Sequence, residues 1–194
     1  MKVLLHSCCA PCSAAILEWM TANGYEPVIY FYNPNIFPQE EYLHRKNEIK
    51  RYAHDLRIEI VDEDGPEDSP ALWTDAHLQW KSGAEPMALE PERGNRCAYC
   101  FRYRLLRTAR YASEHGFTLF TTSLMSSRWK DIVQIMDAGK WAASRYPDVE
   151  FWDKNWRKGG LYERRNLLAR QFYNQQYCGC EYSIRSRYSA ENTF

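Results

Sequence analysis

All seven cysteines of the chain fall into three short clusters, and none stands outside them. The clusters are Cys8-Cys9-Ala10-Pro11-Cys12, Cys97-Ala98-Tyr99-Cys100 and Cys178-Gly179-Cys180. Spacings this short suit metal ligation or thiol redox chemistry better than a disulfide framework, which would spread cysteines along the chain. Clusters that offer only thiolates select soft centres, so the pattern indicates zinc or an iron–sulfur cluster.

Three kinds of protein are compatible with these spacings. A structural zinc site would use four of the thiols, although Cys97 and Cys100 stand far from the other clusters in sequence. A dithiol oxidoreductase could use Cys9 and Cys12, whose spacing matches the redox Cys-x-x-Cys motif that follows a strand. An iron–sulfur enzyme needs four thiolates and would leave three thiols for other work. The two pairs that could supply those four thiolates are Cys8/Cys9 and Cys97/Cys100.

Short apolar runs alternate with helical stretches along the chain, which predicts an α/β fold. We expect a Rossmann-like, mainly parallel sheet of four or five strands with helices on both faces, in a single domain over residues 1–194. Ser13 is the expected N-cap of the first helix and residues 62–70 form an acidic turn. The expected strands are 3–7, 28–32, 58–61, 118–122 and 149–152, and the expected helices are 14–23, 39–55, 71–82, 97–115 and 129–145, with a last helix from about residue 161.

The expected strands place their following loops on one edge of the sheet, where α/β proteins bind ligands. The first strand leads into Cys8 and Cys9, the second into Asn33–Asn35, and the fourth into Ser123–Ser127. The Cys97-x-x-Cys100 motif begins a helix and can join this edge, because a helix N-terminus favours thiolate. The sequence therefore predicts a thiolate-rich pocket assembled from distant segments.

The net charge is zero, but the charges are unevenly distributed. Residues 1–92 hold 7 Lys and Arg against 16 Asp and Glu, whereas residues 93–194 hold 18 against 9. Six arginines and no acid occur between Arg93 and Arg110, and aromatic residues interleave with them as a base-stacking surface would require. This asymmetry favours RNA as an anionic partner, with solvated helix faces that pair with the acidic half as the alternative.

No segment has the features of a membrane span or a secretory signal. Met1-Lys2 leads into an apolar run too short for a signal peptide, and no apolar run approaches spanning length. Seven thiols without an export signal are typical of a reducing compartment, so we expect a cytoplasmic protein.

Four segments, in the same order and spacing, resemble the QueH type of epoxyqueuosine reductase. The resemblance extends from Leu4 to about Ser186 and implies a Rossmann-like fold akin to adenine-nucleotide hydrolases. The segments are His6–Cys12, Phe31–Ile36, Arg96–Arg102 and Gln176–Ser183.

The resemblance implies the last step of queuosine synthesis in tRNA. The family reduces the epoxide of epoxyqueuosine, at the wobble position of the anticodon, to the alkene of queuosine. It uses a 4Fe–4S cluster and an adjacent iron ion, without cobalamin. The implied partners are a tRNA that contains epoxyqueuosine and a low-potential electron donor that the sequence does not identify.

The resemblance also implies roles for all seven cysteines. Cys178 and Cys180 match a redox-active disulfide. Cys12 occupies a position where the family can have Asp and which helps to hold the additional iron. The residues that match the 4Fe–4S ligands are Cys8, Cys9, Cys97 and Cys100.

Other residues could contact the substrate. Asn33 and Asn35 could hydrogen-bond to the modified base, and Arg102 could bind phosphate. The proton that epoxide opening requires could come from Cys12, Tyr32 or Tyr42. We therefore count Asn33, Asn35, Tyr42 and Arg102 as candidate substrate-binding residues.

Two other functions fit parts of the pattern. A tRNA thiolation enzyme would need a glycine-rich phosphate loop after the first strand, but Cys8–Cys12 occupy that place and no glycine precedes Gly24. A zinc-stabilised RNA-binding module is the non-enzymatic alternative.

Overall fold

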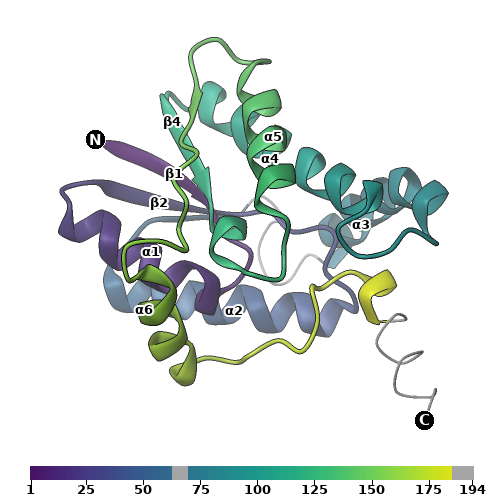
Figure 1. The fold of residues 1–194 in the computed structure, drawn as a ribbon, viewed down its shortest axis with the longest axis horizontal. Coiled ribbons are helices and arrows are strands. Elements are labelled where there is room, and N and C mark those ends of the chain that lie inside the picture. The colour runs from purple at the N-terminus through teal and green to yellow at the C-terminus, as the bar shows by residue number, and fades with distance from the viewer. Residues whose placement is uncertain (63–69, 185–194) are drawn as a thin grey trace.

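A five-stranded sheet lies between two layers of helices (Figure 1). The structure, a computed structural model, describes residues 1–62 and 70–184, so most of the expected acidic turn at 62–70 lies outside it. The strand order is β3-β2-β1-β4-β5 and all four pairs are parallel. The expected α/β class and the parallel pairing of the first two strands are thus confirmed. The strands are β1 (Lys2–His6), β2 (Glu26–Phe31), β3 (Ile60–Asp62), β4 (Leu119–Thr122) and β5 (Glu150–Phe151).

Helices cover both faces of the sheet. Helices α1, α2 and α6 pack together beneath it in Figure 1, and α4 and α5 pack against each other above it. The α-helices are α1 (Ala10–Ala22), α2 (Gln39–Leu56), α3 (Pro70–Ala84), α4 (Asn95–Glu114), α5 (Ile132–Ala143) and α6 (Leu161–Leu168). Three short 3₁₀ helices are η1 (Glu85–Met87), η2 (Ser123–Ser126) and η3 (Ala169–Gln171).

Burial explains why the central strand and α4 form where they do. Residues 3–6 of β1 are all fully buried, and a strand covered on both faces is apolar at consecutive positions. Along α4 the buried positions recur every three or four residues, so Cys100 and Arg104 lie on the same face, toward the interior. The helix therefore presents a thiol and a guanidinium side by side.

Two helix starts differ from the sequence prediction. Helix α1 begins at Ala10, with Cys9 at the N-cap, because Pro11 suits the first turn, where no N–H partner is needed. Ser13 therefore lies inside the helix, and its hydroxyl donates to the Cys9 carbonyl at 2.9 Å. The prediction of Ser13 as the N-cap was wrong because it overlooked this proline signal.

Helix α5 begins at Ile132 and not at residue 129. The Asp131 carboxylate caps it by accepting from the backbone N–H groups of Val133 and Gln134, at 2.8 and 3.2 Å. The residues from 127 to 131 are consequently a loop at the carboxyl edge of the sheet. Within the part of the chain that the structure describes, no helix combines the length and the apolar character needed to cross a membrane.

Candidate metal and substrate site

Cys8, Cys9 and Cys12 form one group of thiols where β1 runs into α1. Their sulfur atoms all lie within 4.8 Å of one another, and those of Cys8 and Cys9 are 3.7 Å apart. All three residues are buried. Among the described residues, no other set of three or more His, Cys, Asp or Glu side chains brings its ligand atoms this close. This group could therefore hold a soft metal.

Hydrogen-bond donors from three distant segments converge on these sulfurs. The Ser123 hydroxyl in η2 donates to Cys8 Sγ at 3.4 Å. Gln175 Nε2 lies 3.2 Å from Cys9 Sγ and 3.9 Å from Cys12 Sγ. Arg165 Nη2 lies 3.9 Å from Cys12 Sγ. Donors of this kind stabilise thiolates and tune the metals that thiolates bind.

Within the first group, Cys12 is the cysteine whose side chain most favours the deprotonated, negatively charged form. Hydrogen bonds from the Cys8 and Cys9 thiols lower the pKa of Cys12 well below its ordinary value, against the effect of burial. The charges of Arg165 and Lys130 lower that pKa further. Burial is the main cause that raises the pKa of the Cys9 thiol, and hydrogen bonding to Cys12 adds to the rise. Cys12 is therefore the residue of this group that most favours the thiolate form, which is the form that binds metals.

The other four cysteines form a second group between α4 and the C-terminal segment. The backbone N–H of Arg93 donates to Cys97 Sγ at 3.3 Å, and Arg104 Nη1 lies 4.0 Å from Cys100 Sγ. Burial raises the pKa of Cys97 to about 11 and that of Cys100 to about 12, and in both cases the charge of Cys178 adds to the rise. Burial thus outweighs the helix N-terminus that was expected to favour thiolates here. All seven cysteines are free thiols in the structure.

A cavity of about 640 Å³ opens beside both groups. Cys97, Cys178 and Cys180 line it, and so does Pro11, the neighbour of Cys12. Lys130 also lines the cavity. Burial lowers the pKa of Lys130, but the charges of Cys178, Cys8, Cys12 and Cys9 outweigh that effect and raise it. Lys130 therefore lies close to the three thiols of the first group and to Cys178 of the second, on the cavity that Pro11 and Cys97 also line.

Three arginines near the thiols have buried N–H groups that lack a hydrogen-bond acceptor. Arg96 is 2% exposed and lines the cavity, and its Nη1 donates to the carbonyls of Met87, Ala88 and Glu90. Its Nε and Nη2 find no hydrogen-bond partner among the described residues, and neither do the Nε atoms of Arg104 and Arg165. A buried N–H group without an acceptor is costly, and an anionic metal centre bound by thiolates would supply acceptors and negative charge near these guanidinium groups. The donor set is therefore compatible with a metal centre bound by thiolates.

Residues 3–186 match the family described as Epoxyqueuosine reductase QueH. The chain belongs to this family. It is 47% identical over 186 residues to the epoxyqueuosine reductases QueH of Histophilus somni and Acinetobacter baylyi; the match covers 95% of the chain and 72% and 81% of those proteins. The QueH protein of Thermotoga maritima is 31% identical over 187 residues, which cover 95% of the chain and 91% of that protein. The resemblance carried by the four sequence segments is thereby confirmed.

Two of the candidate substrate residues of this QueH protein are asparagines buried beside the second strand. Asn33 is fully buried: its Nδ2 donates to the Ser7 carbonyl at 2.9 Å, and its Oδ1 accepts from Arg104 Nη2. Asn35 is also buried, and its Oδ1 finds no hydrogen-bond partner among the described residues. Neither lines the cavity. Asn33 thus braces Arg104 beside Cys100, and contact of either asparagine with substrate stays a prediction.

The other two candidate substrate residues also lie outside the cavity lining. Tyr42 is buried, with its ring near those of Phe31 and Trp73. Arg102 is exposed on α4, with its guanidinium 5.5 Å from the centre of the Trp141 ring. Arg102 therefore faces solvent, where RNA phosphate could reach it.

The QueH motifs in the sequence did not single out several residues that the structure places at the site. Gln175 has a weak signal, since it directly precedes the Gln176–Ser183 segment. Lys130 has a signal outside those motifs, because its position after the fourth strand predicts that it lies at the rim of the site, and it does line the cavity. Arg165 has none, because its position beside Cys12 depends on the packing of α6 against α1.

Proposed function

We propose that the protein reduces epoxyqueuosine to queuosine in the wobble position of tRNA, without cobalamin, as a single cytoplasmic domain over residues 1–194. Family membership supports the reaction. The observation that carries the proposal is the cavity lined by Cys97, Cys178 and Cys180, with the Lys130 ammonium beside them. Such a cavity offers reducing thiols and a cation to one enclosed substrate, which is what removal of an epoxide oxygen requires.

The vicinal pair Cys178 and Cys180 matches the stoichiometry of the reaction. Removing the epoxide oxygen as water breaks two C–O bonds, forms the alkene, and consumes two electrons and two protons. Oxidation of the dithiol to a disulfide forms one S–S bond and releases two electrons and two protons. An external low-potential donor would then reduce the disulfide, so the pair acts as an electron store that faces the substrate.

The metal centre is the other part of the proposal. We assign the 4Fe–4S ligands to Cys8, Cys9, Cys97 and Cys100, with Cys12 holding an additional iron ion. Such a centre supplies single-electron transfer and a Lewis acid for the epoxide oxygen. The charges of Cys8, Cys9 and Cys12 act on Lys130, and Lys130 lines the same cavity as Cys97, which supports a centre shared by the two groups. The low pKa of Cys12 supports its role as a resident thiolate.

Lys130 is placed to stabilise the oxygen as it leaves the ring. Its raised pKa keeps the ammonium protonated in the cavity, so Nζ can donate to an alkoxide oxygen. A fixed cation that faces developing negative charge lowers the barrier most when water is excluded. The two protons that the leaving oxygen takes up would be those that the Cys178 and Cys180 thiols release on oxidation.

The test uses anaerobically reconstituted protein, tRNA that contains epoxyqueuosine, and a low-potential reductant with no cobalamin. Digestion of the RNA and mass analysis of its nucleosides should show the loss of one oxygen from the modified nucleoside. An unchanged nucleoside with a fully loaded brown protein would refute the reaction. Colourless protein that binds tRNA without turnover would favour the zinc-stabilised RNA-binding module, and gain of sulfur would favour thiolation.

A further inference from the structure

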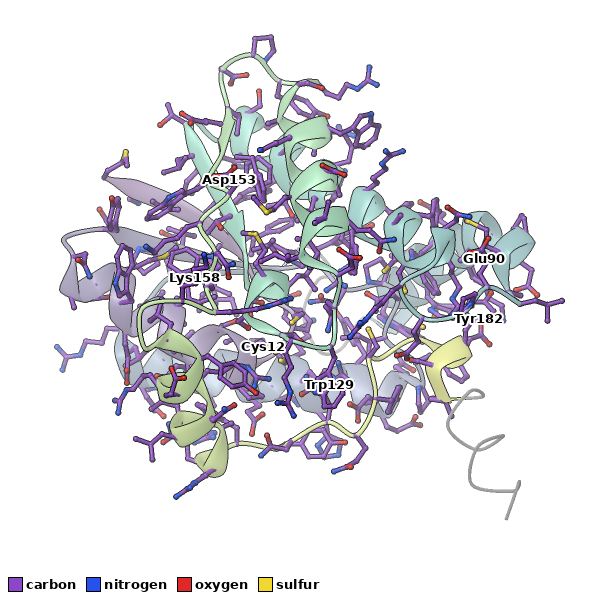
Figure 2. All side chains as sticks on the ribbon, viewed as in Figure 1. Cys12, Glu90, Trp129, Asp153, Lys158 and Tyr182 are labelled. Carbon is purple, nitrogen blue, oxygen red and sulfur yellow. The ribbon has the colours of Figure 1, made fainter. Side chains whose placement is uncertain are left out.

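Trp129 stands out because it exposes its ring at the rim of the cavity. Its side chain is 68% exposed, and it is the single exposed tryptophan of the seven, all of which lie in described residues. It belongs to the segment 127–131 between η2 and α5, which we call the Trp129 loop. Trp129 also lines the cavity, and Figure 2 shows it on the same side of the molecule as Cys12. Large exposed rings at a site are typical of contact surfaces.

The Trp129 loop is held in place by arginines from two other segments. Arg157 Nη2 donates to the carbonyls of Ser127 and Lys130, the latter at 2.8 Å. Arg93 Nε donates to the Trp129 carbonyl at 3.0 Å. The backbone on both sides of Trp129 is therefore anchored, and its ring is presented to solvent by a fixed loop.

The surroundings of the ring are cationic. The guanidinium of Arg128, which is exposed, lies 4.9 Å from the centre of the Trp129 ring. The Asp131 carboxylate is occupied by the first turn of α5, so its charge is partly satisfied there. The charged residues that line the cavity are Arg93, Arg96, Lys130 and Arg165, against Glu92 and Asp131.

The size of the cavity determines which part of an RNA strand can enter it and which part stays at its rim. A volume of about 640 Å³ lies in the range of ~300–1,000 Å³ that small-molecule pockets occupy, so it admits one modified nucleoside. The neighbouring nucleotides of the same strand must stay outside, at the rim. We propose that Trp129 stacks on the base next to the modified nucleotide and that Arg128 binds the adjoining phosphate. The proposal rests on the proposed function, which supplies the RNA strand.

RNA fits this surface better than the electron-donor protein does. Protein interfaces centre on several contiguous apolar residues, but Trp129 is the one exposed large hydrophobic residue among the described residues that line the cavity. One flat ring beside a guanidinium suits one base and one phosphate.

The first experiment measures the affinity of the full-length protein for a labelled anticodon stem-loop by fluorescence anisotropy. Trp129→Ala removes the base–aromatic stack and should therefore bind the stem-loop about 5- to 150-fold more weakly than the wild type. Trp129→Phe should retain most of the affinity. Val133→Ala is the matched control, since Val133 is 62% exposed four residues later and does not line the cavity. It should bind as the wild type does. An unchanged affinity in Trp129→Ala would overturn the proposal.

The second experiment asks which base stacks on Trp129. Stem-loops with an abasic site on one or the other side of the wobble nucleotide are bound to wild type and to Trp129→Ala. At one of the two positions, the losses from the abasic site and from Trp129→Ala should not add, because both remove the same contact. Full additivity at both positions would contradict stacking.

Turnover separates this proposal from the proposed function. With active enzyme, Trp129→Ala should raise KM for tRNA and leave kcat at saturating tRNA unchanged. Non-additive binding together with no turnover in any variant would keep the stacking contact and reject the reaction. If Trp129→Ala instead left RNA affinity unchanged and slowed reduction by an acidic flavoprotein, the surface would belong to the donor and stacking would be rejected.

Discussion

The backbone N–H of Arg93 donates to Cys97 Sγ at 3.3 Å. Arg93 itself has a φ of 67°, in the left-handed region. A residue with a side chain adopts this conformation at a cost of about 1–2 kcal/mol. The same residue's guanidinium holds the Trp129 carbonyl. One strained residue therefore links a proposed cluster ligand to the rim of the cavity, and strain of this kind concentrates at functional sites.

Removal of the Cys97 thiol should abolish the metal centre. In Cys97→Ala, anaerobic reconstitution should give protein with sharply reduced iron and sulfide, because a 4Fe–4S cluster needs four thiolates. Cys178→Ser is the matched control from the same cavity. It should keep the colour of the cluster and lose turnover. A full, air-sensitive cluster in Cys97→Ala would show that the ligand assignment is wrong.

Arg45 should be far more important for stability than its neighbour Arg51 on α2. The Arg45–Glu41 pair is buried at 2.6 Å, and Arg45 also donates to the carbonyls of Tyr177 and Cys178. Replacement by Met leaves the Glu41 charge buried and should lower the free energy of unfolding by ~3–5 kcal/mol.

Urea denaturation measures this difference. Arg51 forms the same i,i+4 pair with Asp55, but at 3.9 Å and in solvent, so Arg51→Ala should cost under about 0.5 kcal/mol. Similar losses in both variants would mean that burial does not decide the strength of these pairs.

Alkaline pH should destabilise the attachment of the C-terminal segment to α2. Burial raises the pKa of Tyr52 from 10.0 to about 12, and the charge of Glu18 adds to the rise. Its ring lies edge-on to that of Phe172, with the ring centres 4.9 Å apart. The folded protein thus favours the neutral phenol, and this contribution is complete below pH 10 and is lost as pH rises through about 12.

The free energy of unfolding, measured in metal-free protein at a series of pH values, tests this sign. Wild type should lose stability between pH 10 and about 12 more steeply than Tyr52→Phe, which has no phenol to ionise. Identical slopes in the two proteins would exclude Tyr52 as a source of the pH dependence.

Arg102 should contribute to RNA binding through phosphate. Because it is exposed on α4, Arg102→Ala should weaken binding of unmodified tRNA and reduce the slope of log affinity against log salt by about 1. Arg51→Ala, also exposed but on α2, is the control and should leave the slope unchanged. Equal slopes for wild type and Arg102→Ala would place Arg102 outside the RNA contact.

The uneven charge along the chain does not translate directly into a surface. Arg104 belongs to the basic stretch but is buried against Asn33, and Lys46 is buried in an ion pair with Asp62 at 2.8 Å. The interleaved aromatics are not one stacking surface either. Phe101 is 3% exposed, and the Tyr99 hydroxyl donates to the Trp80 carbonyl at 3.2 Å. A helix turns successive side chains in different directions, so composition alone does not say which of them face solvent.

The sequence by itself determined the succession of strands and helices along the chain, the class of fold, and which cysteines are clustered as candidate ligands and redox thiols. These follow from local periodicity and from spacings within a few residues, such as the clusters at Cys8–Cys12 and Cys178–Cys180. Even there, the start of α5 was predicted three residues early, because the cap at Asp131 was missed.

Only the tertiary structure decided which side chains meet. Gln175 contacts the sulfur of Cys9 and Arg165 contacts that of Cys12, each across more than 150 residues of chain. The charges of Cys178 and of the Cys8–Cys12 thiols raise the pKa of Lys130. Contacts at such separation leave no periodic signal in the sequence, because they depend on how α6 and the C-terminal segment pack over α1. The exposure of Trp129 depends on packing in the same way, since two distant arginines hold its loop at the rim.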